Sequence, residues 1–128
     1  MKELTKAEEQ VMQILWKMGK GFVKDIINHM PNPKPAYNTV STIIRILENK
    51  EFVGHVAYGK THEYYPLINK KEYTGAFFKG FMKNYFSSSY QQLVSFFAKE
   101  EDLSTEEMEA IISILSNELK KQKQNGNK

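Results

Sequence analysis

The chain contains no cysteine, and this absence excludes both disulfide bonds and metal sites built on thiolates. It also contains no run of 18 apolar residues of the kind that spans a membrane. The charged residues Lys2, Glu3 and Lys6 interrupt the start of the chain, where a signal peptide would need an apolar segment. We therefore predict a cytoplasmic protein that does not insert into a membrane.

Histidine is scarce as well. His29, His55 and His62 are the only three, and none pairs with an aspartate or glutamate at a metal-ligand spacing. The sequence also has no glycine-rich phosphate loop, no nucleophile elbow and no cysteine nucleophile. We predict that the protein is not an enzyme and uses neither a cofactor nor a metal.

Length and charge limit the possible domain organisation and partners of the chain. With 128 residues and 41% hydrophobic content, the chain fits one domain, or a small domain with an added assembly element. Its formal net charge is +3, and residues 1–72 hold 11 Lys and Arg against 8 Asp and Glu. Residues 73–128 hold 7 of each, so the positive excess lies in the first part of the chain. Such a charge is compatible with a polyanionic partner without requiring one.

The first 35 residues have the pattern of two helices followed by a proline-rich connection. Thr5 and Glu8 form a capping box, and apolar residues then repeat at helical spacing up to Met18. The segment from Val23 to His29 predicts a shorter helix, which the three prolines between Pro31 and Pro35 cannot continue. Together with the polar-faced helix that follows, this pattern predicts a helix-turn-helix.

The stretch from Pro35 to Gly54 begins as a helix with two different faces. Its apolar stripe consists of Val40, Ile43, Ile44 and Leu47. Roughly opposite lie Asn38, Thr42, Arg45 and Asn49, flanked by Thr39 and Ser41. The polar face is either an ordinary solvated surface or a recognition helix for the major groove of DNA. Surface helices usually carry Glu and Lys pairs, whereas this one has short polar residues and no acid before Glu48, which favours recognition.

Two segments rich in aromatic and β-branched residues come next, Phe52 to Tyr58 and His62 to Ile68. They predict a β-hairpin, in which Gly59 can supply a positive φ. The predicted fold class is therefore mainly α with a small β-hairpin, as a winged helix-turn-helix domain over residues 1–70. Lys60 at the hairpin tip is expected to reach a phosphate or the minor groove. The full set of predicted DNA-binding residues is Asn38, Thr39, Ser41, Thr42, Arg45, Tyr58, Lys60 and His62.

Residues 71–123 have the pattern of short amphipathic helices with no sheet to cover them. They could fold back on the winged domain, but small cores are marginal alone, and pairing with a second copy is a common remedy. We predict a helical dimerisation domain here and thus a homodimer. The residues expected at its interface are Phe77, Phe81, Leu93, Phe97, Ile111, Ile112 and Leu115. Residues 124–128 are expected to form a disordered polar tail.

Four segments together resemble the BlaI/MecI family of penicillinase repressors, to which copper-responsive CopY-type repressors also belong. They are LTKAEEQVMQILW (Leu4 to Trp16), NTVSTIIRIL (Asn38 to Leu47), YYPL (Tyr64 to Leu67) and LVSFFAKEE (Leu93 to Glu101). The resemblance runs from about Leu4 to Leu119. Many members carry Lys or Arg where this chain has Ser41, and Arg where it has Ile46.

The resemblance implies a homodimeric winged-helix repressor bound to a palindromic operator in double-stranded DNA, with Thr39, Ser41 and Thr42 in contact with the DNA. In antibiotic-responsive members, a membrane metallopeptidase sensor brings about cleavage in the C-terminal region. The cleaved pair aligns with Phe96 and Phe97, which are therefore the candidate cleavage site. Aromatic residues on such a helix are more often buried in a core or interface, and both roles stay open.

The copper-responsive members use C-terminal cysteine pairs, so the absence of cysteine excludes copper sensing of that kind. A winged helix that serves as a protein-interaction module, without sequence-specific DNA binding, is the alternative function.

Overall fold

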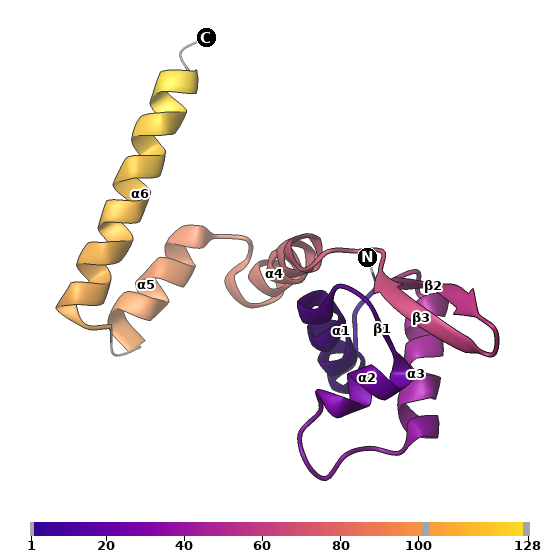
Figure 1. Ribbon diagram of the computed structural model, residues 1–128. Coiled ribbons are helices and arrows are strands. Elements are labelled where there is room, and N and C mark those ends of the chain that lie inside the picture. The colour runs from indigo at the N-terminus through magenta and orange to yellow at the C-terminus, as the bar shows by residue number, and fades with distance from the viewer. Residues whose placement is uncertain (1, 101–102, 127–128) are drawn as a thin grey trace. The chain divides into compact units, whose positions relative to one another are not determined.

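Helices make up most of the structure, a computed structural model that describes residues 2–100 and 103–126 (Figure 1). Its elements are α1 (Lys6–Met18), β1 (Gly21–Phe22), α2 (Val23–Asn28), α3 (Tyr37–Asn49), β2 (Val53–Tyr58), β3 (Thr61–Pro66), α4 (Lys70–Phe86), α5 (Tyr90–Glu100) and α6 (Thr105–Gly126). They form two compact units, residues 1–80 and residues 81–128, and the division falls inside α4. None of the described helices has the length and apolar character needed to cross a bilayer.

The first unit is built around the apolar faces of α1, α2 and α3. The predicted capping box begins α1: the Glu8 N–H donates to Thr5 Oγ1 at 3.2 Å, and the Thr5 N–H donates to Glu8 Oε1 at 3.0 Å. The core combines these helices with the hairpin and the start of α4, and consists of Leu4, Val11, Met12, Leu15, Val23, Ile26, Met30, Val40, Ile44, Leu47, Phe52, Val53, Tyr64 and Tyr73. Each large apolar side chain buried in this way contributes about 1.5–3 kcal/mol, which holds α3 firmly in place.

A three-stranded antiparallel sheet, in the order β1-β3-β2, completes the first unit. The predicted hairpin is present: β2 and β3 pair from Val53 with Pro66 to Tyr58 with Thr61, and Gly59 takes φ 62° in the turn. The short strand β1 adds a third strand that the sequence did not indicate, because two residues are too few to show a period. The predicted fold class, a mainly α winged helix-turn-helix with a small sheet, is confirmed.

The second unit comprises the end of α4 with α5 and α6. Ser87 and Ser88 turn the chain after α4 with φ values of 50° and 61°. Ser89 then caps α5, because its Oγ accepts a hydrogen bond from the Gln92 N–H at 3.2 Å. The helix break that the serine triplet predicted is therefore present.

The last helix is longer than expected. α6 begins at the predicted capping box, in which Ser104 Oγ accepts the Glu107 N–H at 3.1 Å. It then continues to Gly126, so the expected disordered tail is wrong for residues 124–126, and residues 127–128 lie outside the described residues. The reason is local: lysine and glutamine dominate residues 120–124, and both are good helix formers even when fully solvated.

Candidate nucleic-acid interface

α3 buries one face in the core and leaves a polar face in solvent. Val40, Ile44 and Leu47 have no exposed surface, as the apolar spacing predicted. The exposed polar residues of the helix include Asn38, Thr39, Thr42 and Arg45. Two more exposed residues, Tyr37 and Ile46, were missed as candidate contacts because the prediction considered only polar side chains.

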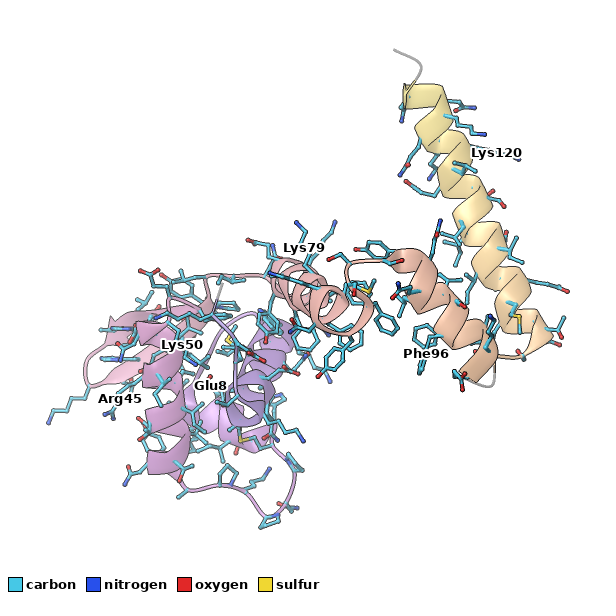
Figure 2. The ribbon with its side chains drawn as sticks, turned by 180° about the vertical axis from the view of Figure 1, so that it is seen from behind. Glu8, Arg45, Lys50, Lys79, Phe96 and Lys120 are labelled. Carbon is cyan, nitrogen blue, oxygen red and sulfur yellow. The ribbon has the colours of Figure 1, made fainter. Side chains whose placement is uncertain are left out.

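Ser41 departs from the expected arrangement. Its residue is only 7% exposed, and its Oγ accepts a hydrogen bond from Arg45 Nη2 at 3.0 Å. The Ser41 hydroxyl is thus engaged by Arg45, and the expected contact of Ser41 with DNA stays a prediction. Ser41 lies on the flank of the helix, between the buried residues Val40 and Ile44 and the exposed residues Thr42 and Arg45. Arg45, labelled in Figure 2 on the outer side of α3, is oriented by this bond.

The exposed face of α3 can both donate and accept hydrogen bonds. The Thr42 hydroxyl donates to the Asn38 carbonyl at 2.9 Å, which leaves the hydroxyl lone pairs available as acceptors. The Asn38 amide offers a donor and an acceptor, and the Arg45 guanidinium offers several donors in a plane. The helix contains a single acid, Glu48, in its last turn. Groups of these types can pair with the edges of bases in a major groove.

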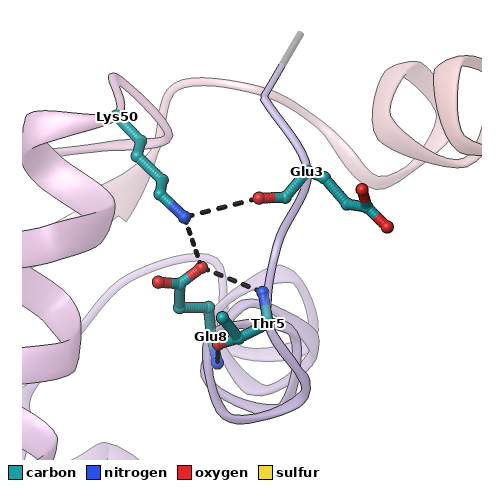
Figure 3. Close-up of polar contacts among 4 residues, drawn as sticks. All are labelled: Glu3, Thr5, Glu8 and Lys50. Atoms are coloured by element: carbon teal, nitrogen blue, oxygen red, sulfur yellow. Dashed lines mark hydrogen bonds and ion pairs between the residues drawn. The ribbon is translucent and has the colours of Figure 1, made fainter.

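The end of α3 is tied to the start of α1, as Figure 3 shows. Lys50 Nζ donates to Glu8 Oε1 at 2.7 Å and to the Glu3 carbonyl at 3.3 Å. The Glu8 side chain is 7% exposed and that of Lys50 is 23% exposed, so water screens the pair poorly. The two residues lie 42 positions apart, and no local sequence pattern indicates their contact.

The ionisation of Glu8 is part of this arrangement. Burial alone would raise the pKa of Glu8, but the hydrogen bonds and charge of Lys50, with the hydrogen bonds of Thr5, lower it below the ordinary value of 4.5. A lowered folded-state pKa stabilises the fold at neutral pH, and that contribution is lost as the pH falls through the folded pKa. The attachment of α3 to α1 therefore depends on an ionised Glu8.

The N-terminus of α3 follows the proline-rich connection, which Lys34 holds in place. Lys34 Nζ donates to three carbonyl oxygens at the end of α2, those of Ile27 (3.3 Å), Asn28 (3.2 Å) and Met30 (2.7 Å). A cation at the C-terminus of a helix satisfies carbonyls that have no partner within the helix and complements the helix dipole. The proline-rich connection is thus held against α2, which positions the N-terminus of α3.

Two of the three predicted wing residues, Tyr58 and Lys60, are exposed to solvent near the tip of the hairpin. Lys60 is exposed in the turn, and Tyr58 is exposed while its ring packs at 6.0 Å from that of Phe22. The third, His62, is half-buried, because its ring stacks on that of His55 with centroids 4.1 Å apart. Tyr58 and Lys60 are therefore the residues of this predicted set that the hairpin presents freely.

The sequence prediction missed His55, which forms an ion pair through Nδ1 with Glu48 Oε2 on α3. The buried Tyr64 lies beside both imidazole rings, with its ring 5.6 Å from that of His55 and 6.1 Å from that of His62. Burial raises the pKa of Tyr64, the Glu48 carboxylate raises it further, and the Arg45 guanidinium lowers it. A two-residue turn at Gly59 and Lys60 would have placed His55 diagonally opposite His62, so the stacked pair could have been anticipated from the hairpin register.

The residues predicted for dimerisation form two groups. Phe77 on α4, with Phe97, Ile111, Ile112 and Leu115 in the second unit, are 42% to 62% exposed. Phe81 and Leu93 are partly buried, and Phe81 belongs to a line of aromatic rings in the second unit. In that line Phe86 lies 5.8 Å from both Phe81 and Phe96. Large apolar surface of this extent on a monomer indicates an interaction site.

Phe96 and Phe97, the candidate cleavage pair, lie within α5. Their rings are 6.1 Å apart, and both residues remain 43% exposed despite the contact of Phe96 with Phe86. The pair is thus accessible from solvent but held in helical backbone.

The fold and the exposed polar helix define a winged-helix transcription regulator. The family comparison then identifies it more closely: the model of the penicillinase repressor family matches residues 4–117, and the chain belongs to that family. Membership makes the protein a transcriptional repressor and not an enzyme. The resemblance inferred from the four sequence segments is confirmed.

Individual relatives match over most of their length. The methicillin resistance regulatory protein MecI of Staphylococcus aureus (strain N315) is 29% identical over 115 residues, covering 89% of this chain and 94% of MecI. The penicillinase repressor of Bacillus licheniformis is 22% identical over 123 residues, covering 95% of this chain and 96% of the relative. Among solved structures, the DNA binding domain of the repressor BlaI is 25% identical with a TM-score of 0.49, and covers 57% of this chain and 94% of that domain.

Proposed function

We propose that the protein is a homodimeric repressor that binds a palindromic operator in double-stranded DNA through α3. The observation that carries the proposal is the two-faced character of this helix. Val40, Ile44 and Leu47 on its apolar side are fully buried and Ile43 is partly buried, while Asn38, Thr42 and Arg45 are exposed to solvent. A rigidly held helix with short polar side chains can approach base edges closely enough to read them.

The exposed residues divide into base-reading and backbone-binding groups. Arg45, held by Ser41, is the proposed contact to a guanine, and Asn38 can pair with an adenine. Thr39 and Thr42 provide methyl groups for thymine as well as hydroxyls. On the wing, Lys60 is the proposed phosphate contact, with Tyr58 and His62 beside it.

Dimerisation is proposed to occur through residues 71–123. The exposed apolar residues of α5 and α6 support this, because a second copy would cover them. Phe77 extends the proposed interface onto α4. Two copies related by a two-fold axis read two half-sites, and a palindrome mirrors that symmetry. One half-site alone seldom provides enough affinity for a specific complex.

Relief of repression is proposed to follow cleavage between Phe96 and Phe97, by or through a membrane metallopeptidase sensor that responds to a β-lactam-type signal. The name of the relative MecI, a methicillin resistance regulatory protein, supports this assignment. Because the pair lies in α5, that helix must unwind locally before a protease can bind its backbone. Cleavage would separate α6, with Ile111, Ile112 and Leu115, from the DNA-binding unit. As a repressor acts where the chromosome lies, we propose a cytoplasmic location.

Replacing Arg45 tests this function. We expect Arg45→Ala to cost about 1–3 kcal/mol of binding free energy on a duplex selected by the wild-type protein, and much less on random duplex. Fluorescence anisotropy with both duplexes measures the difference. Lys120→Ala removes the same charge from α6 and should leave both affinities within about 2-fold.

The outcome also separates the two functions that a winged helix supports. An equal loss on both duplexes would contradict base reading by Arg45. If Arg45→Glu left DNA binding unchanged, the protein-interaction module would become the better assignment.

A further inference from the structure

A cleft of about 820 Å³ lies in the first unit, between α1 and the segment that leads from β3 into α4. Its lining comes from the second half of α1, from His29 after α2, and from the stretch between Pro66 and Glu72. The described residues that line it include none of those proposed to contact DNA. Small-molecule sites in proteins have volumes of about 300–1,000 Å³, so this cleft is large enough to hold such a ligand.

Contacts between α1 and the start of α4 hold the walls of the cleft in place. Trp16 Nε1 donates to the Ile68 carbonyl at 2.8 Å, and the Trp16 ring lies 5.7 Å from that of Tyr73. At the start of α4, the Glu72 N–H donates to Asn69 Oδ1 at 2.8 Å. Because these contacts lie within the protein itself, the cleft is preformed, and a ligand need not order its walls in order to bind.

The cleft combines apolar side chains with positive charge. Ile14 and Trp16 are partly buried, and Leu67 is 53% exposed. Lys17 at the end of α1 and Lys70 at the start of α4 bring two ammonium groups. Neither lysine forms a hydrogen bond or an ion pair with the part of the chain that the structure describes. Both charges are therefore available to an anion, beside apolar surface that a ligand can cover.

The single acid in the lining, Glu72, does not cancel this charge. Its Oε1 accepts the Asn69 N–H at 3.5 Å, at the N-terminus of α4, where a carboxylate complements the helix dipole. With two lysines against one glutamate, the lining keeps a formal charge of one positive unit. The charge of the cleft therefore favours a negatively charged ligand.

We propose that this cleft binds a small organic carboxylate with an apolar body. Lys17 and Lys70 pair with the carboxylate, and Trp16 and Leu67 cover the apolar body. Its volume suits a small molecule, and the apolar part of its lining favours an amphiphilic anion over an inorganic one. The inference goes beyond the proposed DNA-binding function and does not depend on it.

Trp16 provides the readout for a test, because it is the only tryptophan of the chain. In proton–nitrogen correlation spectra of the full-length protein, its indole N–H should give one resolved signal. We expect diphenylacetate to shift this signal saturably and to bind at least about 5-fold more tightly than the uncharged diphenylacetamide. Inorganic phosphate, which has charge but no apolar body, should also bind at least about 5-fold more weakly than diphenylacetate.

Charge-removing variants locate the anion. Lys17→Gln combined with Lys70→Gln should weaken binding of diphenylacetate by about 3- to 10-fold, since both ammonium groups are lost. Lys24→Gln combined with Lys71→Gln is the matched control, because it removes the same charge from residues that do not line the cleft. It should keep the affinity within about 2-fold of the wild type.

The comparison of acid and amide uses the wild-type protein, so it holds even if a double variant fails to fold. An unshifted Trp16 signal, or affinities for diphenylacetate and diphenylacetamide within about 2-fold of each other, would overturn the inference. Equal losses in the two double variants would overturn it as well. A protein that binds diphenylacetate but prefers no duplex over random DNA would instead defeat the proposed function alone.

Discussion

The two units of this protein differ in how much of their apolar surface they bury for themselves. Among its described residues, the first unit has a continuous core of 14 buried side chains drawn from helices, sheet and the start of α4. In the described part of the second unit, Met82 is the only buried hydrophobic residue, while α5 and α6 expose aromatic and aliphatic side chains along their length. The first unit therefore has what it needs to fold alone, whereas the second exposes the apolar side chains that the proposed dimer would cover.

Removing most of the second unit should produce the largest effect. We expect a chain ending at Ser95 to keep the folded winged helix, because the core residues all precede this point. It should be monomeric and lose at least about 100-fold in affinity for a selected palindromic duplex, since only one half-site is read at a time. Sedimentation velocity and a gel shift measure the two properties. A dimeric fragment would show that assembly resides elsewhere.

Replacing an isoleucine by alanine in each unit compares how much a buried and an exposed apolar side chain contribute to stability. Ile44→Ala creates a cavity in the core and should lower the free energy of unfolding of the first unit by about 2–5 kcal/mol. Ile114→Ala, at a residue 67% exposed on α6, should change stability by no more than about 0.5 kcal/mol. Urea denaturation measures both. A large cost at Ile114 would mean that the proposed dimer buries it as well.

Breaking the ion pair of Glu8 and Lys50 should cause the next largest loss of stability. Lys50→Met leaves the Glu8 carboxylate without its counter-charge and should destabilise the first unit by about 2–4 kcal/mol at neutral pH. Lys20→Met is the control, because Lys20 forms an exposed pair with Glu63 at 3.8 Å that should contribute no more than about 0.5 kcal/mol.

The same pair predicts an acid dependence with a definite sign. Because the folded pKa of Glu8 lies below 4.5, its contribution is fully present above that value. It is lost as the pH falls through the folded pKa, so the cost of Lys50→Met should shrink in acid. A cost that stayed the same from pH 7 to pH 3 would show that the charge of Glu8 does not matter.

The smallest effect is expected at the wing. Lys60→Ala should weaken binding by a similar factor on selected and random duplexes and reduce the slope of log affinity against log salt by about one. Lys17→Ala, on α1, should leave the slope unchanged. Titrations at several salt concentrations measure it, and an unchanged slope in Lys60→Ala would rule out the proposed phosphate contact.

Local sequence patterns predicted the elements of the first unit well. The period of Val40, Ile44 and Leu47 gave the buried side of α3, and the turn at Gly59 gave the hairpin. What they missed depends on contacts between distant parts of the chain. The Lys50 to Glu8 pair spans 42 positions, and the strand β1 is defined only by its pairing with β3.

In the candidate site, too, local sequence patterns did not predict the details that depend on tertiary contacts. Helical spacing placed Ser41 at the edge of the polar face but did not show whether its side chain would be buried or exposed. Ser41 is buried in the structure, and its hydroxyl accepts a hydrogen bond from Arg45, which the helical spacing alone did not indicate. Likewise, the pairing of His55 with Glu48 requires the hairpin to lie against α3, which no single segment specifies.

Selection of duplexes from a random library by the full-length protein, at moderate salt, tests the central claim most directly. We predict enrichment of palindromic sequences, each bound by two copies of the chain, with strong preference over random competitor DNA. A protein that enriches no sequence, or binds all duplexes alike, would contradict the claim that α3 reads bases.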